Sequence, residues 1–241
     1  MGENPFLLFV YRARQRKECM NSQDKPLIIL ASASPRRVEI LKNHGIKPIV
    51  MPSNAKEILP SDLAITNLPE DEQEEVDRRA VEYLAELKVK NVADLIISKG
   101  DEFQSEQIII IGADTMVFKG EKLGKPKDKD DAYRMIDLLQ GDRHKVITGV
   151  AMLRLDFNDA SKKLEINSKD VFCCETIVSC YKMAEEEINE YVNMDEPYDK
   201  AGAYAIQGYF QKYIEKYEGD FENVMGLPYF MIEDKLKGCN K

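Results

Sequence analysis

Short apolar runs and amphipathic stretches alternate along the chain, and this alternation predicts an α/β fold with a mixed, twisted sheet and flanking helices. The run 27–32 is short and continuously apolar, which is typical of a buried strand. Ser34 and Pro35 then suit the N-cap and the first residue of a helix. The isoleucine-rich run 108–118 predicts a strong strand that ends or kinks near Gly112.

The rest of the chain continues the alternation. Acidic, proline-containing residues 54–75 are expected to form a solvated loop, and 91–107 to be less regular. Further helices are expected at 35–45, 76–90, 130–141, 184–194 and after 226–228, and further strands at 47–53, 144–155, 170–181, after the turn 200–209 and within 212–220.

The first 25 residues hold a short apolar run and then the basic stretch RARQRK. They lack a small-residue cleavage site, so we expect a flexible extension, although the arginines leave a mitochondrial address open. We expect residues 26–241 to form a single domain.

Composition narrows the function classes. The chain of 241 residues has a net charge of −9, which argues against broad binding to nucleic acid or to a membrane surface. No apolar run approaches the roughly 20 residues that span a bilayer. The five cysteines are odd in number and show no zinc-like spacing, so free thiols and a cytoplasmic location are expected.

The turn between the first strand and the first helix is a candidate phosphate site. Free backbone N–H groups and the positive end of the helix dipole favour an anion at such a turn. Hydroxyls and guanidinium groups that suit phosphate oxygens follow there: Ser32, Ser34, Arg36 and Arg37. A capped helix with two surface arginines is an equally weighted alternative.

The isoleucine-rich strand leads into a second candidate site. Asp114 and Thr115 emerge near its end, where α/β proteins place their sites. An Asp there commonly binds a metal or acts as a base, and capping the next turn is the alternative. Lys88 and Lys125 suit a polyphosphate, and Glu57 could bind a metal, but each by itself also fits a solvated surface residue.

The stretch KAGAYAIQG, residues 200–208, is more informative. Its small residues allow close backbone approach, and the amide of Gln207 offers the paired donor and acceptor that a nucleobase edge requires, although a turn glutamine is the alternative. His144 and Thr148, in HKVITG, are more typical of structural polar groups.

Taken together and in this order, the motifs resemble the Maf family of nucleotide pyrophosphatases. The resemblance runs from about Leu27 to about Leu236 and rests on SASPRR, a Glu in a short acidic stretch, LAxxK, GADT, GKP, HxVxTG, KAGAYxIQG and NVxGLP. It implies the elongated α/β fold shared with the inosine triphosphate pyrophosphatases, with a cleft between two lobes. It also implies cleavage between the α- and β-phosphates of a nucleoside triphosphate, assisted by Mg²⁺ or Mn²⁺.

The resemblance also assigns roles to residues. It makes Asp114 the catalytic proton acceptor and a metal ligand, with Lys125 as a second catalytic residue and Glu57 as the other metal ligand. It places Ser32, Ser34, Arg36, Arg37 and Lys88 on the phosphates. Members that prefer dTTP and UTP carry an Arg, a Thr and a Gln that match Arg36, Thr115 and Gln207, so a house-cleaning dTTP/UTP pyrophosphatase is expected.

Two other functions compete with this expectation. A regulatory protein that binds a nucleotide or partner, linked to cell-division arrest, would not need the complete set of catalytic residues. Nucleic-acid binding through RARQRK is disfavoured by the acidic total. A homodimer is the family-based expectation. The resemblance also indicates insertions at 57–75 and 97–107.

Overall fold

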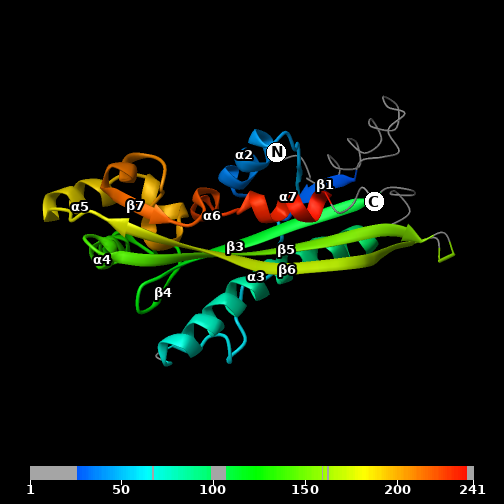
Figure 1. The fold of residues 1–241 in the computed structure, drawn as a ribbon, viewed down its shortest axis with the longest axis horizontal. Coiled ribbons are helices and arrows are strands. Elements are labelled where there is room, and N and C mark those ends of the chain that lie inside the picture. Colours follow the sequence, from blue (N-terminus) through cyan, green and yellow to red (C-terminus); the bar gives the residue numbers. More distant parts are fainter. Residues whose placement is uncertain (1–25, 67, 99–106, 159, 162, 238–241) are drawn as a thin grey trace. The chain divides into compact units, whose positions relative to one another are not determined.

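The computed structural model describes residues 26–66, 68–98, 107–158, 160–161 and 163–237. The expected flexible extension 1–25 lies outside these ranges. A mixed sheet has the strand order β2-β1-β3-β5-β6-β7, with β4 paired to β3 off this path (Figure 1). Its strands are β1 (Leu27–Leu30), β2 (Ile49–Val50), β3 (Ile108–Phe118), β4 (Lys122–Leu123), β5 (Arg143–Asn158), β6 (Lys163–Cys180) and β7 (Ile214–Glu218).

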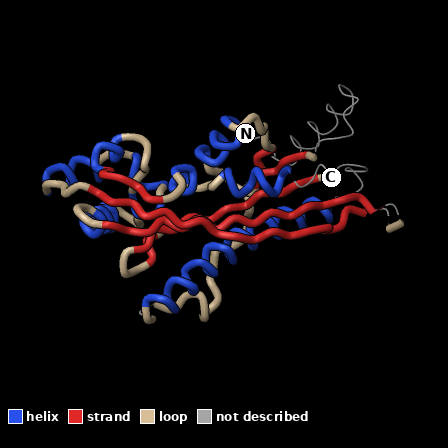
Figure 2. Tube along the Cα trace, viewed as in Figure 1, coloured by secondary structure: helices blue, strands red, loops and turns tan. Residues whose placement is uncertain are grey.

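Helices flank this sheet, which confirms the predicted α/β class (Figure 2). The α-helices are α2 (Pro35–Asn43), α3 (Glu70–Ser98), α4 (Lys129–Leu139), α5 (Glu185–Val192), α6 (Phe221–Met225) and α7 (Tyr229–Lys237). Short 3₁₀ turns are η2 (Glu196–Asp199), η3 (Ala201–Ala203) and η4 (Tyr209–Tyr213). No helix in the described part of the chain is long and apolar enough to cross a membrane.

The continuous apolar character of β1 follows from its place in the sheet. It pairs in parallel with both β2 and β3, and its residues are buried except the half-buried Ile28. The later strands are antiparallel neighbours: β3 with β4, β6 with β7, and the long pair β5 and β6, which run in opposite directions in Figure 1.

Helix α3 corrects two predictions. It begins at Glu70 rather than 76, and it continues to Ser98 through residues that were expected to be irregular (Figures 1 and 2). Acidic residues stabilise a helix N-terminus, so the acidic run that predicts a solvated loop in the sequence instead forms the start of α3. Val92, Ala93 and Ile96 are buried and keep the helical spacing of Ala85 and Val89, so the periodicity does extend this far.

Strand β3 passes through Gly112 without ending, which corrects the expected break. The glycine instead permits close packing, because a Cβ there would lie 2.7 Å from Cγ1 of Val89 on α3. Gly149 on β5 also permits close packing against α3, since a Cβ there would lie 2.3 Å from the carbonyl carbon of Val81.

Three smaller expectations also differ. The second strand is shorter than expected, and β5 and β6 are longer. The strand expected after the turn 200–209 is instead the 3₁₀ turn η4, and Gly208, its N-cap, has a positive φ of 106°.

The described chain forms two compact units, and each is built from three separate sequence segments. The first unit consists of the described residues up to Ile58, together with Tyr83–Ala113 and Val150–Phe172. The second takes Leu59–Glu82, Asp114–Gly149 and the chain from Cys173 onward. Each unit has its own apolar core: the first packs β1 and the second half of α3, and the second packs α4, α5 and the η3–η4 turns.

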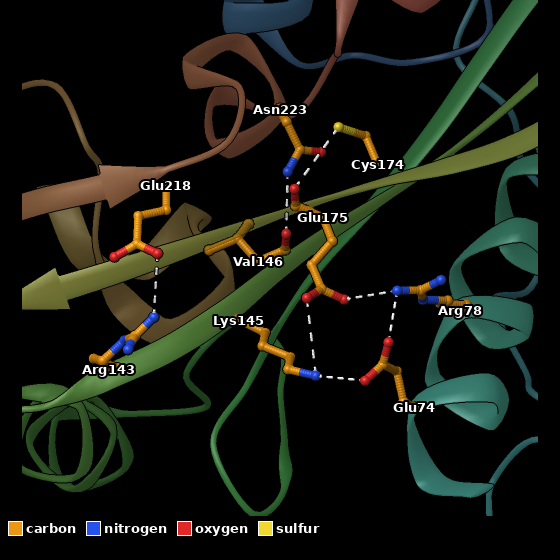
Figure 3. A network of polar contacts seen from close by, with 9 residues as sticks. All are labelled: Glu74, Arg78, Arg143, Lys145, Val146, Cys174, Glu175, Glu218 and Asn223. Carbon is orange, nitrogen blue, oxygen red and sulfur yellow. Dashed lines mark hydrogen bonds and ion pairs between the residues drawn. The ribbon is translucent and has the colours of Figure 1, made fainter. Parts of the chain in front are cut away.

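Within the second unit, the start of α3 is tied to the sheet by a closed ring of four charges (Figure 3). Arg78 donates to Glu74 at 2.6 Å and to Glu175 of β6 at 3.3 Å. Lys145 of β5 donates to Glu74 at 2.7 Å and lies 3.8 Å from Glu175. Alternating charges of this kind stabilise one another more than an isolated surface pair does.

The ring predicts an acid-sensitive contribution to stability. The hydrogen bond from Lys145 lowers the pKa of Glu74 below its ordinary value of 4.5. A carboxylate with a lowered folded-state pKa stabilises the fold above the unfolded-state pKa, and this stabilisation is lost as the pH falls below about 4.5. We expect Glu74→Gln to lower Tm by up to about 2–4 °C at pH 7 and by less at pH 3.5, as measured by calorimetry. Glu75→Gln, an exposed site on the same helix, should change neither value.

Candidate active site

The SASPRR turn lies between β1 and α2, and Ser32 organises it. Ser32 is 8% exposed, and its hydroxyl accepts hydrogen bonds from the backbone N–H of Ser34 at 3.2 Å and from Nη1 of Arg37 at 3.0 Å. Pro35 is the first helical residue and Ser34 the N-cap, as predicted, but the Ser34 side chain makes no capping hydrogen bond. The Ser34 hydroxyl is therefore not committed to capping α2.

The two arginines of this turn are both half-buried on the first turn of α2. The guanidinium of Arg37 donates to the Ser32 hydroxyl. Both side chains have further interactions within the fold. Ala31 donates its N–H to the carbonyl of Ile111, so this turn leaves the sheet beside the middle of β3.

Lys88 brings α3, the loop after β2 and strand β3 together. Its ammonium lies 3.1 Å from Oε1 of Glu57 and 3.4 Å from the carbonyl oxygen of Ala113, while the Lys88 side chain is only 10% exposed. Asn91, almost one turn further along α3, accepts from the Ser53 hydroxyl and the Asn54 N–H. The helix thus fixes the loop that carries Glu57.

Asp114 directly follows the carbonyl that Lys88 contacts, and it is 7% exposed. Asp114 and Thr115 project from opposite faces of β3, because successive strand residues alternate. Phe118 shares the face of Asp114 and packs with Val81 of α3. Thr115 lies on the other face, where its hydroxyl is 2.9 Å from that of Thr148 on β5.

The described strand pairing of β3 is interrupted along one edge. Ile108–Ile111 pair with β1, and Val117 and Phe118 pair with β4. Among the described pairings, residues 112–116 have no strand partner on that edge, whereas β5 covers the other edge. Asp114 and Thr115 lie within this interrupted segment.

Gln207 is exposed and lies in a turn that the side chain of Glu196 stabilises through hydrogen bonds. The carboxylate of Glu196 accepts from the backbone N–H of Tyr209 at 3.0 Å and from the hydroxyl of Tyr191 at 3.2 Å. The predicted close backbone approach is confirmed at Gly202, where a Cβ would lie 3.0 Å from Cγ2 of Val117. The KAGAY turn therefore packs beside the face of β3 that carries Thr115. Lys125 is exposed in the loop after β4.

The structure thus arranges the predicted residues in two sets, one in each unit. The first unit contains Ser32, Ser34, Arg36, Arg37, Glu57 and Lys88, and the second contains Asp114, Thr115, Lys125 and Gln207. Within the first set, Ser32 contacts Arg37 and Glu57 contacts Lys88. The sequence interpretation missed Glu196 and Asn223, although Asn223 begins the NVxGLP motif.

The described cysteines and His144 do not suit nucleophilic chemistry. Burial raises the pKa of Cys173 and Cys180 to about 12 and that of Cys174 to about 11, so these thiols stay protonated near neutral pH. Burial lowers the pKa of His144 to about 3, and its neutral ring pairs with the hydroxyl of Tyr204 at 2.7 Å. His144 is therefore a structural polar group, as its position in the sequence indicated.

Comparison with known proteins places these motifs in one family. The model of the family described as Maf-like protein matches residues 27–239. The chain belongs to the Maf family.

A protein of Alkaliphilus oremlandii named dTTP/UTP pyrophosphatase is 42% identical over 205 residues, which cover 85% of this chain and 92% of the relative. A protein of the same name from Agathobacter rectalis is 37% identical over 215 residues, with 87% and 96% covered. A third, from a Thermoanaerobacter species, is 40% identical over 212 residues, with 87% and 95% covered.

Membership of the Maf family agrees with the resemblance drawn from the motifs. The matched region covers both compact units and begins with β1, so it includes every predicted site residue. The alignments with relatives named as pyrophosphatases likewise cover 85% and 87% of this Maf chain.

Proposed function

We propose that this Maf protein is a nucleoside triphosphate pyrophosphatase that hydrolyses dTTP and UTP to the nucleoside monophosphate and pyrophosphate. The observation that carries the proposal is the buried carboxylate of Asp114 at the open edge of β3, next to the carbonyl that Lys88 contacts. The printed names of relatives up to 42% identical support the substrate class.

The hydrolysis assigns one proton transfer to Asp114. A water oxygen bonds to the α-phosphorus, the bond from that phosphorus to the bridging oxygen breaks, and pyrophosphate leaves. Asp114 accepts the proton of the water as a general base. Arg36, Arg37, Lys88 and Lys125 are proposed to bind the triphosphate, because guanidinium and ammonium groups offset its negative charge in a net acidic protein.

We propose a divalent cation that is shared with the substrate, because carboxylate oxygens are ligands that such cations prefer. Among the described residues no group of three or more potential metal-binding side chains comes together, so a complete protein cage is not the expected form of this site. Mg²⁺ commonly binds through one or two carboxylates and the substrate phosphates. We propose Asp114 and Glu57 as these carboxylates, with Mg²⁺ or Mn²⁺ supplying charge stabilisation on the phosphoryl oxygens. The homodimer and the cytoplasmic location stay predictions.

Product analysis tests the proposal directly. The purified chain is incubated with Mg²⁺ and a panel of nucleoside triphosphates, and the products are separated by chromatography. We expect UMP or dTMP together with pyrophosphate. Diphosphate plus orthophosphate would overturn the assigned scissile bond, and binding without turnover would favour the regulatory alternative.

A further inference from the structure

Lys125, one of the lysines proposed to bind the triphosphate, depends on its backbone for its position. It lies in an exposed loop after β4, and its ammonium makes no hydrogen bond or ion pair with another described residue. A lysine side chain that no partner holds keeps much of its rotamer freedom. The residues just before it, at the end of the β3–β4 hairpin, therefore decide which positions the ammonium can reach.

Two of these residues tie the loop to the second unit. Leu123 is fully buried in the apolar core of that unit and pairs with Val117 of β3. The carbonyl oxygen of Gly124 accepts the backbone N–H of Gly202 at 3.0 Å. Strand β4 has only two residues, however, and a short two-stranded hairpin is marginally stable by itself. A further contact is needed to hold it.

Lys122, the other residue of β4, makes this contact. Its side chain is 15% exposed, and its ammonium donates to the carbonyl oxygen of the buried Leu63 at 2.7 Å. The same ammonium lies 3.4 Å from Oδ1 of Asp77 on α3, whose side chain is 9% exposed. Separation of a buried ion pair leaves an uncompensated charge and is costly. The pair therefore holds β4 beside the first half of α3.

A glutamine on α3, Gln73, fixes the two elements that this ammonium contacts. Its Nε2 donates to Oδ1 of Asp77 at 2.8 Å and to the carbonyl oxygen of Ile65 at 3.3 Å. Its Oε1 accepts the backbone N–H of Leu68 at 3.3 Å. Residues 59–66, which the sequence predicted as part of a solvated loop, are thus joined to both α3 and β4.

We propose that Lys122 is a positioning residue for Lys125, and that residues 59–66 and Asp77 act through Lys122 to place the Lys125 ammonium for a phosphate. All of these residues belong to the second unit. Only three positions separate the two lysines, so a shift of β4 at Lys122 moves the backbone of Lys125 with it. The inference rests on the proposed function, in which Lys125 binds the triphosphate.

A double-mutant cycle tests whether Lys122 acts through Lys125. The probe is inorganic tripolyphosphate with Mg²⁺, whose Kd is measured by titration calorimetry. We expect Lys122→Met to raise Kd by up to about tenfold, the scale of one hydrogen bond to a charged group. Lys122→Met combined with Lys125→Met should bind no more weakly than Lys125→Met alone, because the positioned group is already absent.

A second variant separates positioning from folding. Asp77→Asn combined with Lys122→Met removes the uncompensated buried charge and leaves an acceptor oxygen for Gln73, so it should regain most of the Tm lost by Lys122→Met. Its Kd should stay raised, since β4 still lacks its contact. The fitted stoichiometry reports the binding-competent fraction, so partial misfolding does not imitate a change in Kd. Lys216→Met, which removes an exposed ammonium from β7, should leave Kd unchanged.

The outcomes distinguish the inference from the proposed function. Equal weakening by Lys122→Met with and without the Lys125 ammonium overturns the inference, as does recovery of both Tm and Kd in the variant that also carries Asp77→Asn. Wild-type affinity in Lys125→Met overturns it as well. If the two lysines are coupled but the wild-type protein releases no UMP and pyrophosphate from UTP, the proposed function has failed and the inference about Lys122 stands.

Discussion

Replacement of Asp114 by asparagine is expected to lower kcat for UTP hydrolysis by about 10²–10⁴-fold, the usual contribution of a general base. The amide has nearly the same shape as the carboxylate but cannot accept the proton of the attacking water. Asp114 is buried on β3, and asparagine fills nearly the same volume there. We therefore expect Tm to change little. Pyrophosphate release and a thermal melt measure the two effects.

The matched control is Asp137→Asn, at an exposed position on α4. It makes the same chemical change within the same unit and should leave kcat unaltered. Wild-type turnover by the Asp114 variant would show that another group accepts the proton. Equal losses in both variants would point to a general effect of charge on binding of the triphosphate.

Replacement of Gly149 by alanine is expected to destabilise the fold by about 3 kcal/mol, the upper end of the range for overpacking in a core. The new Cβ would lie 2.3 Å from the carbonyl carbon of Val81 and 2.6 Å from the backbone nitrogen of Glu82. Backbone atoms cannot rotate away as a side chain does, so α3 must separate from β5. For a chain of this size Tm should fall by roughly 6–12 °C, as measured by calorimetry.

Gly124→Ala is the control for this change. No atom lies within 4 Å of the position of a Cβ at Gly124, and its φ is not positive. Its Tm should remain within about 1–2 °C of the wild-type value, since substitutions away from packed features usually change stability by less than about 0.5 kcal/mol. A Tm unaltered by Gly149→Ala would mean that α3 and β5 can separate at little cost.

Local chemistry made much of the first unit predictable. The short apolar run of β1, the N-cap position of Ser34 and the first helical position of Pro35 each depend on a few neighbouring residues, and all three are confirmed. The length of α3 was not predicted, because an acidic segment suits both a solvated loop and the start of a helix. Packing of its buried face decided the outcome.

The site divides in the same way. Asp114 was identified because it was expected near the end of an apolar strand, although β3 continues to Phe118 and Asp114 lies within it. The motif sequence indicated Thr115 and Gln207. Glu196 and Asn223 were not identified, because their roles depend on partners far away in the sequence. Asn223 contacts Val146 and Thr176, which lie 77 and 47 residues away. Glu196 is near its partners in sequence, but only the geometry of the turn shows that its carboxylate holds the turn carrying Gln207.

The sequence by itself determined the α/β class, the order of the motifs and the chemical types of the site residues, because hydrophobic periodicity and side-chain chemistry are local properties. Only the tertiary structure decided that α3 packs onto glycines of β3 and β5, and that among the described pairings one edge of β3 has no strand partner beside Asp114. These features arise when strands distant in sequence pair and each buried polar group must find a partner.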